Sequence, residues 1–430
     1  MLCVLAVTVL FSSAIPAVAA TAVGGGWERL RYEEYAWPLQ AVCFVSRTTG
    51  FAIEGEDQGV IYKSTNGGRT WTKLVSATSQ VLSDIYFLNS LNGWAVGSYG
   101  TVVRTTDGGR TWTEGYTGVS DTLEGVHFIS SLVGWAVTDG EYILKTINGG
   151  KTWSKLNPDW ETDDDYFDYY GSEDVYFVSA YTGWCVGSNG EILKTTNGGR
   201  TWVKQSSRTT NTLNRVKFVS ASTGWAVGDA GTVLKTTNGG ATWTRQYTGT
   251  SAPLRSVDFI SSTTGCVVGG TYYQEEGVIL RTTNGGTTWT RLTPTTKVSL
   301  AGVSGRGGTF WAVDDGGSVL RLAPAPTVGT PDAPETMRDD TYYTVKGTLK
   351  PRHTEGTKPI RIYKYKKVDG VWVSKGYSTA TAYDYSTYSQ YKKKMSFSSP
   401  GKWRLRAYHP TCSLHRKRWS TNYEYVTVTR

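Results

Sequence analysis

One phrase that recurs along the chain limits its possible folds more than any other feature. Six copies of Ser/Thr-x-Asn/Asp-Gly-Gly-x-Thr-Trp end at Trp71, Trp112, Trp153, Trp202, Trp243 and Trp289. Successive copies lie 41, 41, 49, 41 and 46 residues apart. Self-similarity at such a period is typical of repeat architectures in which each repeat is one supersecondary unit.

A second phrase, which reads VKFVSASTGWAVGDAGTVLKTT at residues 216–237, precedes each copy of the first. It occurs seven times, around Phe44, Phe87, Phe128, Phe177, Phe218, Phe259 and Val303. In the fifth repeat the four strand-sized segments are Arg215–Val219, Gly224–Val227, Thr232–Thr236 and Thr242–Gln246. Four short strands per repeat are the content of a propeller blade. The sequence therefore predicts an all-β chain with a seven-bladed β-propeller over residues 25–322.

The Asn-Gly-Gly or Asp-Gly-Gly between the third and fourth strands supplies the positive-φ positions of a hairpin turn. We expect the Asn or Asp side chain to bond the turn backbone and the following Trp to pack between blades. The positions predicted to be structural are Asn66, Trp71, Asp107, Trp112, Asn148, Trp153, Asn197, Trp202, Asn238, Trp243, Asn284 and Trp289.

The seventh repeat, Val303–Leu322, lacks the Asn-Gly-Gly-x-Thr-Trp phrase. The missing piece occurs near the N-terminus as Gly-Gly-Trp-Glu-Arg-Leu at residues 25–30. We expect this first strand to complete the last blade, because that arrangement leaves no exposed sheet edge in the ring.

After the repeats, residues 323–336 form a Pro-rich segment that predicts an extended linker. Residues 337–430 carry alternating strand patterns that predict a small β-sandwich of immunoglobulin type. From residue 323 onward, 20 Lys and Arg face 8 Asp and Glu, a net charge of +12, whereas the preceding residues carry −3. We expect this basic domain to contact an anionic cell-wall polymer or an acidic partner, and no nucleic acid.

The first 20 residues are apolar, carry no charge and end in Ala17-Val18-Ala19-Ala20. This pattern predicts a signal peptide, and hence a secreted, possibly envelope-associated protein with no transmembrane span in the mature chain. Cys43, Cys185 and Cys266 fall at strand positions of different repeats, as scattered buried thiols do. With four His in the chain, we expect no metal site and no cofactor, and we expect a monomer.

The six phrases resemble the Asp-box, or bacterial neuraminidase (BNR), repeat. The paired unit is similar to the propellers of the photosystem II assembly and stability factor family and its bacterial relatives, over Gly25–Leu322. Asp-box propellers include sialidases, xyloglucan-cleaving glycosidases, sorting receptors and assembly chaperones, so the resemblance implies a fold and not one function. The photosystem members imply a membrane-protein partner, and only their scaffold is carried over to this chain.

Three segments depart from the repeat length, namely residues 54–58, 157–172 and 271–276. All three are expected on one rim, formed by the loops that enter the first strand and join the second strand to the third. Insertions gathered on one face favour a binding surface. The predicted ligand-binding residues are Glu56, Asp57, Trp160, Asp163, Asp165, Tyr166, Tyr169, Tyr272, Tyr273 and Glu275.

Residues 157–172 place aromatic side chains among aspartates. This mixture suits a sugar or a basic peptide, could hold calcium, or is a solvated acidic loop. We favour a non-enzymatic binding or scaffold protein for a glycan or an extracellular protein. The alternatives are a glycoside hydrolase with Asp57 and Asp165 as its carboxylates, xyloglucanase- or sialidase-like, and an assembly or sorting factor for an exported protein.

Charged residues also occur in the innermost strands, near the ring axis. Arg215, Lys217 and Arg255 either meet an anionic group or pair with acids at matching positions, which are Asp84, Asp174 and Asp258. His127, the only His of the propeller, is expected to be a packed or channel-lining residue.

Overall fold

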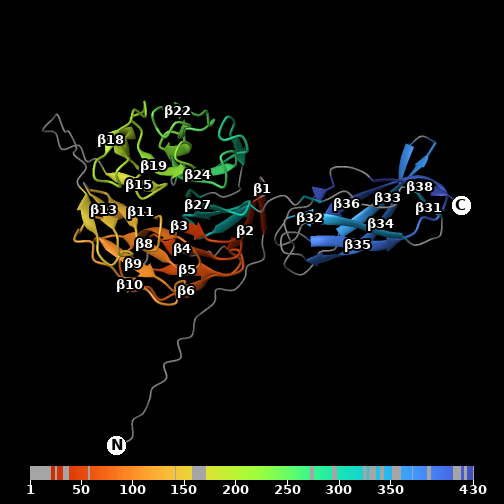
Figure 1. Cartoon of the computed structure of the whole chain (residues 1–430), viewed down its shortest axis with the longest axis horizontal. Helices are drawn as coiled ribbons and strands as arrows, with labels where there is room; N and C mark the ends of the chain where they lie inside the picture. The colour runs from red at the N-terminus through yellow and green to blue at the C-terminus, as the bar shows by residue number, and fades with distance from the viewer. Residues whose placement is uncertain are drawn as a thin grey trace, which may run out of the picture. The chain divides into compact units, whose positions relative to one another are not determined.

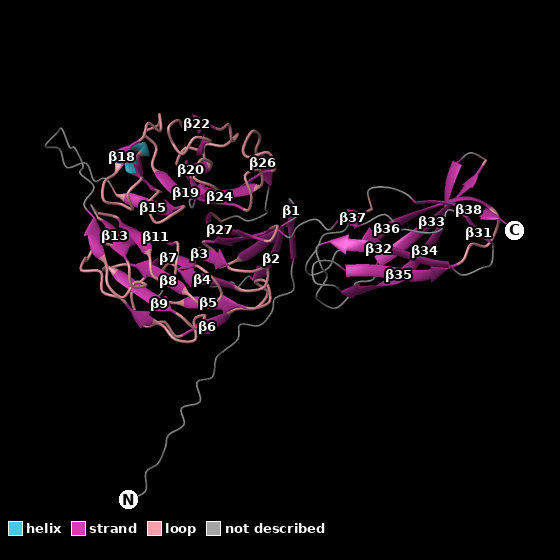
Figure 2. Cartoon of the chain, in the orientation of Figure 1, coloured by secondary structure: helices cyan, strands magenta, loops and turns pink. Residues whose placement is uncertain are grey.

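A computed structural model divides the chain into two compact units, Met1–Leu322 and Ala323–Arg430. Its regular structure is β-strand apart from one 3-10 turn, η1 (Ser188–Gly190) (Figure 2). The structure describes residues 21–24, 27–31, 38–56, 59–140, 142–156, 171–271, 276–292, 298–322, 327–328, 336–338, 343–350, 360–369, 371–384, 389–409, 418–420 and 424–429. The predicted signal peptide, residues 1–20, lies outside them. In the described part, no helix has the length and apolar character needed to cross a membrane.

The first unit is a seven-bladed β-propeller, as the repeats predict (Figure 1). Six blades are four-stranded antiparallel sheets, and the innermost strands of successive blades adjoin one another around a closed ring. Blade one contains β3 (Leu39–Phe44), β4 (Gly50–Glu54), β5 (Ile61–Ser64) and β6 (Thr72–Leu74). Blade two contains β7 (Leu82–Phe87), β8 (Gly93–Gly97), β9 (Thr101–Thr105) and β10 (Thr113–Glu114). Blade three contains β11 (Leu123–Phe128), β12 (Gly134–Thr138), β13 (Ile143–Thr146) and β14 (Ser154–Leu156).

The next three blades follow the same plan. Blade four contains β15 (Ser172–Phe177), β16 (Gly183–Gly187), β17 (Ile192–Thr195) and β18 (Val203–Lys204). Blade five contains β19 (Leu213–Phe218), β20 (Gly224–Gly228), β21 (Thr232–Thr236) and β22 (Thr244–Arg245). Blade six contains β23 (Leu254–Phe259), β24 (Gly265–Thr271), β25 (Glu276–Thr282) and β26 (Thr290–Leu292). The outermost strands are shorter than predicted because the Gly-Gly turn and its Trp take up the preceding residues.

Blade seven joins the two ends of the propeller sequence. Its strands β27 (Leu300–Arg306), β28 (Thr309–Asp314) and β29 (Val319–Leu322) are followed in the sheet by β2 (Trp27–Arg31) and β1 (Thr21–Gly24). Glu28 lies opposite Arg321 in the β2–β29 ladder, and Arg321 Nε donates to Glu28 Oε1 at 2.7 Å. The N-terminal strand thus completes the last blade, as the sequence predicts, and the ion pair joins residues nearly 300 positions apart.

Neighbouring blades pack through stacked aromatic rings. A ring from the second strand of one blade lies on the Phe that ends the first strand of the next blade, with centroids 3.5 to 3.8 Å apart. The pairs are Phe51–Phe87, Trp94–Phe128, Trp135–Phe177, Trp184–Phe218, Trp225–Phe259 and Trp311–Phe44. Between blades six and seven the two positions hold Cys266 and Gly305 instead.

In blades one to six, the glycine that begins the second strand makes room for the Phe that ends the first strand of the same blade. A Cβ on Gly134 would lie 2.5 Å from the Phe128 ring, and the equivalent glycines of the other repeats are equally confined. Because a Cβ atom cannot approach a ring so closely, packing of the Phe requires glycine at the first position of the Gly-Trp dipeptide.

The Asp-box turns lie on the opposite rim to the loops that join second and third strands. In blade two, Asp107 accepts hydrogen bonds from the Thr111 backbone N–H at 3.0 Å and the Thr111 hydroxyl at 2.6 Å, which lower its pKa to about 2. Gly108 and Gly109 adopt φ of 74° and 82°. The Trp of each box packs edge-on against the Phe of its own blade.

The second unit is a β-sandwich in which two sheets share β34 (Val371–Asp384). The first part of β34 pairs with β33 (Ile360–Val368), and its last four residues pair with β35 (Ser389–Met395). The remaining strands are β30 (Thr327–Val328), β31 (Thr336–Arg338), β32 (Tyr343–Lys350), β36 (Gly401–His409), β37 (Arg418–Trp419) and β38 (Glu424–Thr429). The core between the sheets contains Val345, Ile360, Ile362, Ala380, Tyr391, Met395, Phe397, Trp403, Leu405 and Ala407.

Strand β34 is long because it passes from one sheet into the other. One feature of this unit differs from the expectation. The segment predicted as a linker contains β30 and the first residue of β31, and these strands pair with β32 and β38. Backbone pairing therefore takes parts of residues 323–336 into the second unit.

Gly134→Ala tests the packing requirement. We expect it to lower the free energy of unfolding by about 2 kcal/mol, because the added methyl group must displace the Phe128 ring. The measurement is guanidinium denaturation followed by tryptophan fluorescence. The control is Gly316→Ala, whose added Cβ would be 3.4 Å from its nearest neighbour and should change stability by less than about 0.5 kcal/mol. Equal losses in the two variants would contradict the packing requirement.

Candidate functional site at the channel mouth

Each innermost strand of the propeller contains a β-bulge at its second residue. In all seven blades the register with the neighbouring strand shifts at this point. A bulge leaves one residue out of the ladder and re-aims its side chain. The bulged residues are Gln40, Ser83, Glu124, Glu173, Asn214, Arg255 and Ala301.

These seven residues line one cavity of about 350 Å³ at the mouth of the central channel. Arg215, Asp229 and Pro253 complete its wall. The cavity opens on the rim where the innermost strands begin, which is also the rim where second strands connect to third strands. Because of the bulges, the second residue of every innermost strand contributes to the wall of the same cavity.

A three-residue ion-pair cluster forms the floor of the cavity. The Arg215 guanidinium contacts Asp84 at 2.7 Å and Asp174 at 3.3 Å, and thus joins blades two, four and five. Burial opposes the charge on Arg215, but the two carboxylates outweigh it and raise its pKa. Burial raises the pKa of Asp174 to about 6, although Arg215 counteracts part of this rise. The second carboxylate oxygen of each Asp accepts a backbone N–H of the next blade, from Val126 or Val216.

Below this floor the channel is filled. Lys217 Nζ contacts Asp258 at 2.9 Å and lies 5.1 Å from the centre of the Tyr176 ring. His127 is buried between Tyr86 and Tyr176, and its Nδ1 accepts the Phe177 backbone N–H. Burial and then Lys217 lower the pKa of His127 to about 3, so it is neutral. The mouth is therefore a bowl with a closed floor, and a ligand can enter from one side.

Of the two alternatives from the sequence, an anionic ligand or pairing with acids of other blades, the structure shows the pairing for Arg215 and Lys217. Arg215 and Lys217 bond acids at matching positions of other blades. His127 is a packed channel residue. Arg255 has a different place, in the ring of bulged residues at the mouth.

Carboxylates crowd one side of the bowl. Burial, followed by repulsion from Glu124 and Asp229, raises the pKa of Glu173 to about 7. Burial and then Asp139 raise the pKa of Glu124. Half-buried acids that repel one another hold each other partly protonated near neutral pH. A cation that entered the bowl would stabilise their ionised forms.

Blade six, which adjoins blade five, contributes a cation to the mouth. Arg255, from blade six, offsets part of the burial that raises the pKa of Asp315 in blade seven. Glu56, which is exposed, also acts on Asp315 and so lies on the same rim, as the sequence predicts. The bowl is therefore electrostatically polar, with acids over blades three to five and Arg255 next to them on blade six.

The other predicted ligand-binding residues lie outside the described residues. These are Asp57, Trp160, Asp163, Asp165, Tyr166, Tyr169, Tyr272, Tyr273 and Glu275. The proposed hydrolase pair, Asp57 and Asp165, belongs to this group. Within the described ranges, no group of three or more His, Cys, Asp or Glu side chains could hold a metal ion.

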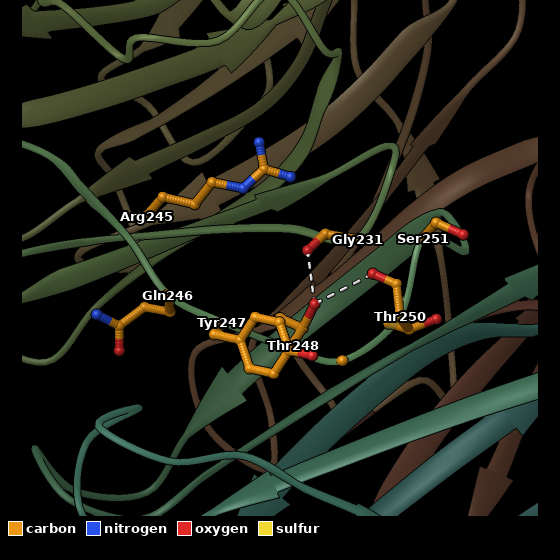
Figure 3. A pocket seen from close by; sticks show the side chains of 8 residues that line it. Gly231, Arg245, Gln246, Tyr247, Thr248, Thr250 and Ser251 are labelled. Carbon is orange, nitrogen blue, oxygen red and sulfur yellow. Dashed lines mark hydrogen bonds between the residues drawn. The ribbon is translucent and has the colours of Figure 1, made fainter.

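Larger hollows lie at the outer edge of the same rim, between a blade and the connection to the next. One hollow of about 540 Å³ is lined by Arg245, Gln246 and Tyr247 (Figure 3). Two more hollows occur at equivalent places in other blades. Their hydroxyl groups bond the connection itself: Thr248 Oγ1 donates to the carbonyl of Gly231 at 3.0 Å or that of Thr250 at 3.3 Å. Because the hollows arise wherever this connection is repeated, we regard them as products of the scaffold.

Sequence reasoning missed Glu124, Glu173 and Asn214. A signal for them exists in the repeats: the second residue of the innermost strand varies from blade to blade, while the residue before it is Leu in six of the seven blades. A variable column inside a repeated phrase is where a scaffold can change its ligand. The bulge that turns this column toward the axis has no sequence marker of its own.

Comparison with known proteins agrees with the fold. A profile of the family described as photosynthesis system II assembly factor YCF48 matches residues 69–161, 158–245 and 204–304, together more than half of the chain. No curated protein sequence matches the chain.

Solved structures of low sequence identity share the architecture. YCF48 from Cyanidioschyzon merolae is 17% identical with a TM-score of 0.57, over 69% of this chain and 98% of that chain. A structure described as YCF48 bound to D1 peptide is 16% identical with a TM-score of 0.55, over 71% and 98%. The GH74 xyloglucanase from Xanthomonas campestris is 11% identical with a TM-score of 0.53, over 91% and 81%. At these identities the likeness shows the fold alone.

Arg215→Gln tests the floor of the bowl. It leaves Asp84 and Asp174 without their cation, so we expect a loss of about 3 kcal/mol in unfolding free energy at about pH 8. The loss should shrink at about pH 5, because the pKa of Asp174 is about 6. Adding Asp84→Asn and Asp174→Asn should restore more than half of it. A triple variant as unstable as Arg215→Gln would contradict the ion-pair explanation.

Glu173→Gln tests the crowded carboxylates. A carboxyl whose pKa rises from 4.5 in the unfolded chain to about 7 in the folded chain makes the protein less stable as pH increases through that window. Relative to the unmodified chain, the variant should therefore gain stability between about pH 4 and pH 8. We expect about 1–2 kcal/mol after allowance for solvent screening of this half-buried group. Thermal unfolding at several pH values measures the difference, and the exposed Glu114→Gln, whose difference should not vary with pH, is the control.

Proposed function

Since the chain belongs to the family of photosynthesis system II assembly factor YCF48, we propose that it is a non-enzymatic binding protein whose channel mouth holds a segment of another protein. The observation that carries the proposal is the closed bowl. Seven bulged side chains surround it, an ion-pair cluster closes its floor, and carboxylates crowd one wall. Such a bowl accepts one side chain or one chain end and not a through-running ligand.

The carboxylates define the chemistry of that segment. Glu124 and Asp229 repel the carboxylate of Glu173, and Arg215 is already paired with two other acids. A Lys or Arg side chain placed among them gains charge-assisted hydrogen bonds and lowers the pKa of Glu173. The ligand is therefore a peptide segment with a basic side chain, and its uncharged part extends toward Arg255.

The relatives are consistent with a protein ligand. The structure described as YCF48 bound to D1 peptide pairs the same fold with a peptide. For this chain we propose an extracellular or exported protein as partner, since the first 20 residues have the pattern of a signal peptide. On this proposal the protein acts outside the cell or on its envelope, as a scaffold or assembly factor.

The basic second unit has a separate part in this proposal. Its net charge of +12 favours attachment to an anionic component of the envelope. In this proposal the β-sandwich binds the envelope, and the bowl of the propeller binds the partner protein.

One observation favours a second candidate, a glycoside hydrolase. Glu173, with a pKa of about 7, lines the same cavity as Glu124. Glycosidases commonly use two carboxyl groups, one of which has a raised pKa and acts as the general acid. This pair joins Asp57 and Asp165, which lie outside the described residues, as the acids to test. GH74 enzymes share the fold, although the closed floor leaves room for only a short part of a polysaccharide.

Fluorescence anisotropy with a labelled Gly-Ser octapeptide that contains two Lys tests the primary proposal. We expect binding at about pH 8 that weakens roughly tenfold at about pH 5.5, where Glu173 is protonated. Glu173→Gln and Glu124→Gln should each weaken binding about tenfold at the higher pH. The matched controls are an octapeptide with Gln in place of Lys and the exposed Glu114→Gln variant, which should retain full affinity.

The same samples are incubated with xyloglucan and assayed for new reducing ends. Peptide binding without reducing ends supports the binding protein. Reducing ends that disappear in Glu173→Gln would establish the hydrolase instead. Equal affinity for the Lys and Gln peptides would contradict the role of the carboxylates.

A further inference from the structure

The outer face of one sheet in the second unit alternates arginine with aromatic rings. Strand β33 lies between β34 and β36 in this sheet. Burial alternates along β36: Trp403, Leu405 and Ala407 are buried in the core, so Arg404 and Arg406 point to the other side. The sheet therefore has one apolar face and one face built from cations and rings.

Cations and rings are paired across the strands of this face. At three successive outward positions β33 and β36 place an arginine beside a tyrosine. These pairs are Arg361–Tyr408, Tyr363–Arg406 and Tyr365–Arg404. The arrangement continues onto β34, where Tyr377 lies opposite Tyr363 and Trp372 lies opposite Lys367.

Contacts between the side chains keep the arginines in place. The Arg404 guanidinium lies 4.8 Å from the Trp372 ring centre and 5.2 Å from that of Tyr365. Arg361 lies 4.9 Å from the centre of the Tyr377 ring. Stacked guanidinium groups lose little further freedom when they bind an anion, and alternate residues along a strand place charges about 7 Å apart.

The side chains that make up this face are cationic, aromatic or hydroxyl-bearing. Arg361, Tyr363, Tyr365 and Lys367 from β33 alternate with the buried side of that strand, and the hairpin-end residue Asp369 follows the last of them. The charge of the face is thus positive, and the complementary ligand is an anion of extended shape.

We propose that this face, which we call the arginine–aromatic face, binds an acidic polysaccharide. Carboxylates of the polymer pair with Arg361, Arg404 and Lys367, while sugar rings and hydroxyls contact Tyr363, Tyr377 and Trp372. The inference rests on the proposed role of the second unit as an attachment domain and specifies its site and ligand class. It is independent of the bowl in the propeller.

Ring geometry favours a polysaccharide over a single-stranded nucleic acid. Tyr363 is tilted by 40° from Tyr377 and by 86° from Tyr408, so the face does not offer parallel rings on which successive bases could stack. The tyrosine hydroxyls, with Ser374 and Thr379 on β34, suit the many hydroxyl groups of a sugar polymer.

Interferometry of the full chain on immobilised polygalacturonate tests the proposal. We expect retention at about 50 mM NaCl that falls steeply toward about 500 mM, because exposed charges are screened. Arg361→Gln with Arg404→Gln should weaken binding at least about tenfold, and Arg361→Lys with Arg404→Lys should retain most of it. Tyr377→Ser should weaken binding at both salt concentrations, because a sugar contact is not screened.

The control is Arg110→Gln with Arg200→Gln, which removes the same charge from exposed turns of the propeller and should change affinity less than about twofold. Glu173→Gln should leave polygalacturonate binding unchanged, so this proposal and the one on the bowl fail separately. Tighter binding to an oligothymidylate than to polygalacturonate would overturn the proposal in favour of a nucleic acid. Lack of retention at low salt, or equal loss in the propeller control, would also overturn it.

Discussion

The stacked ring pair between neighbouring blades is the interaction on which the rest of the propeller depends. Trp135 of blade three lies 3.5 Å from the Phe177 ring of blade four, and its indole N–H donates to the carbonyl of Gly198 at 3.2 Å in the Asp-box of that blade. One side chain therefore supplies apolar burial and a directed bond to the next repeat. Lys145 donates to the same carbonyl at 2.8 Å. Repetition of this stacked and hydrogen-bonded contact sets the distance between neighbouring blades, and so between their innermost strands.

The polar channel is a consequence of that ring. Seven innermost strands turn alternate side chains toward one axis, and several of these side chains are charged. Arg215 and Lys217 pair with acids of other blades. The breaking of such a buried pair is costly, whereas its replacement by apolar groups often is not. Above the paired floor, Glu173 is repelled by Glu124 and Asp229, and these carboxylates lie at the mouth of the channel.

Much of this fold could be predicted from the chain, and less of the site. The repeats identify the blades, and the Trp-Glu-Arg-Leu match identifies the strand that closes the ring, because both rest on local patterns. The matching positions of Arg215 and Asp174 suggested their ion pair. Sequence reasoning did not identify Glu124 and Glu173, since each occupies an ordinary position in its own repeat and its pKa is raised by burial and by acids that the fold brings near it. The rings of the arginine–aromatic face are visible as alternation, but their pairing depends on which strands become neighbours.

The sequence by itself determined the blade, because turns, strand periodicity and the Gly-Trp contact act over fewer than about 50 residues. It also determined the number of blades and the overall charge of the two units. Only the tertiary structure decided which side chains meet: Arg215 reaches Asp84 across 131 residues of chain, and seven bulges from separate repeats form one cavity. The physical reason is that electrostatic interactions and cavities depend on distance in space, and closure of the ring sets those distances for residues that no local pattern relates.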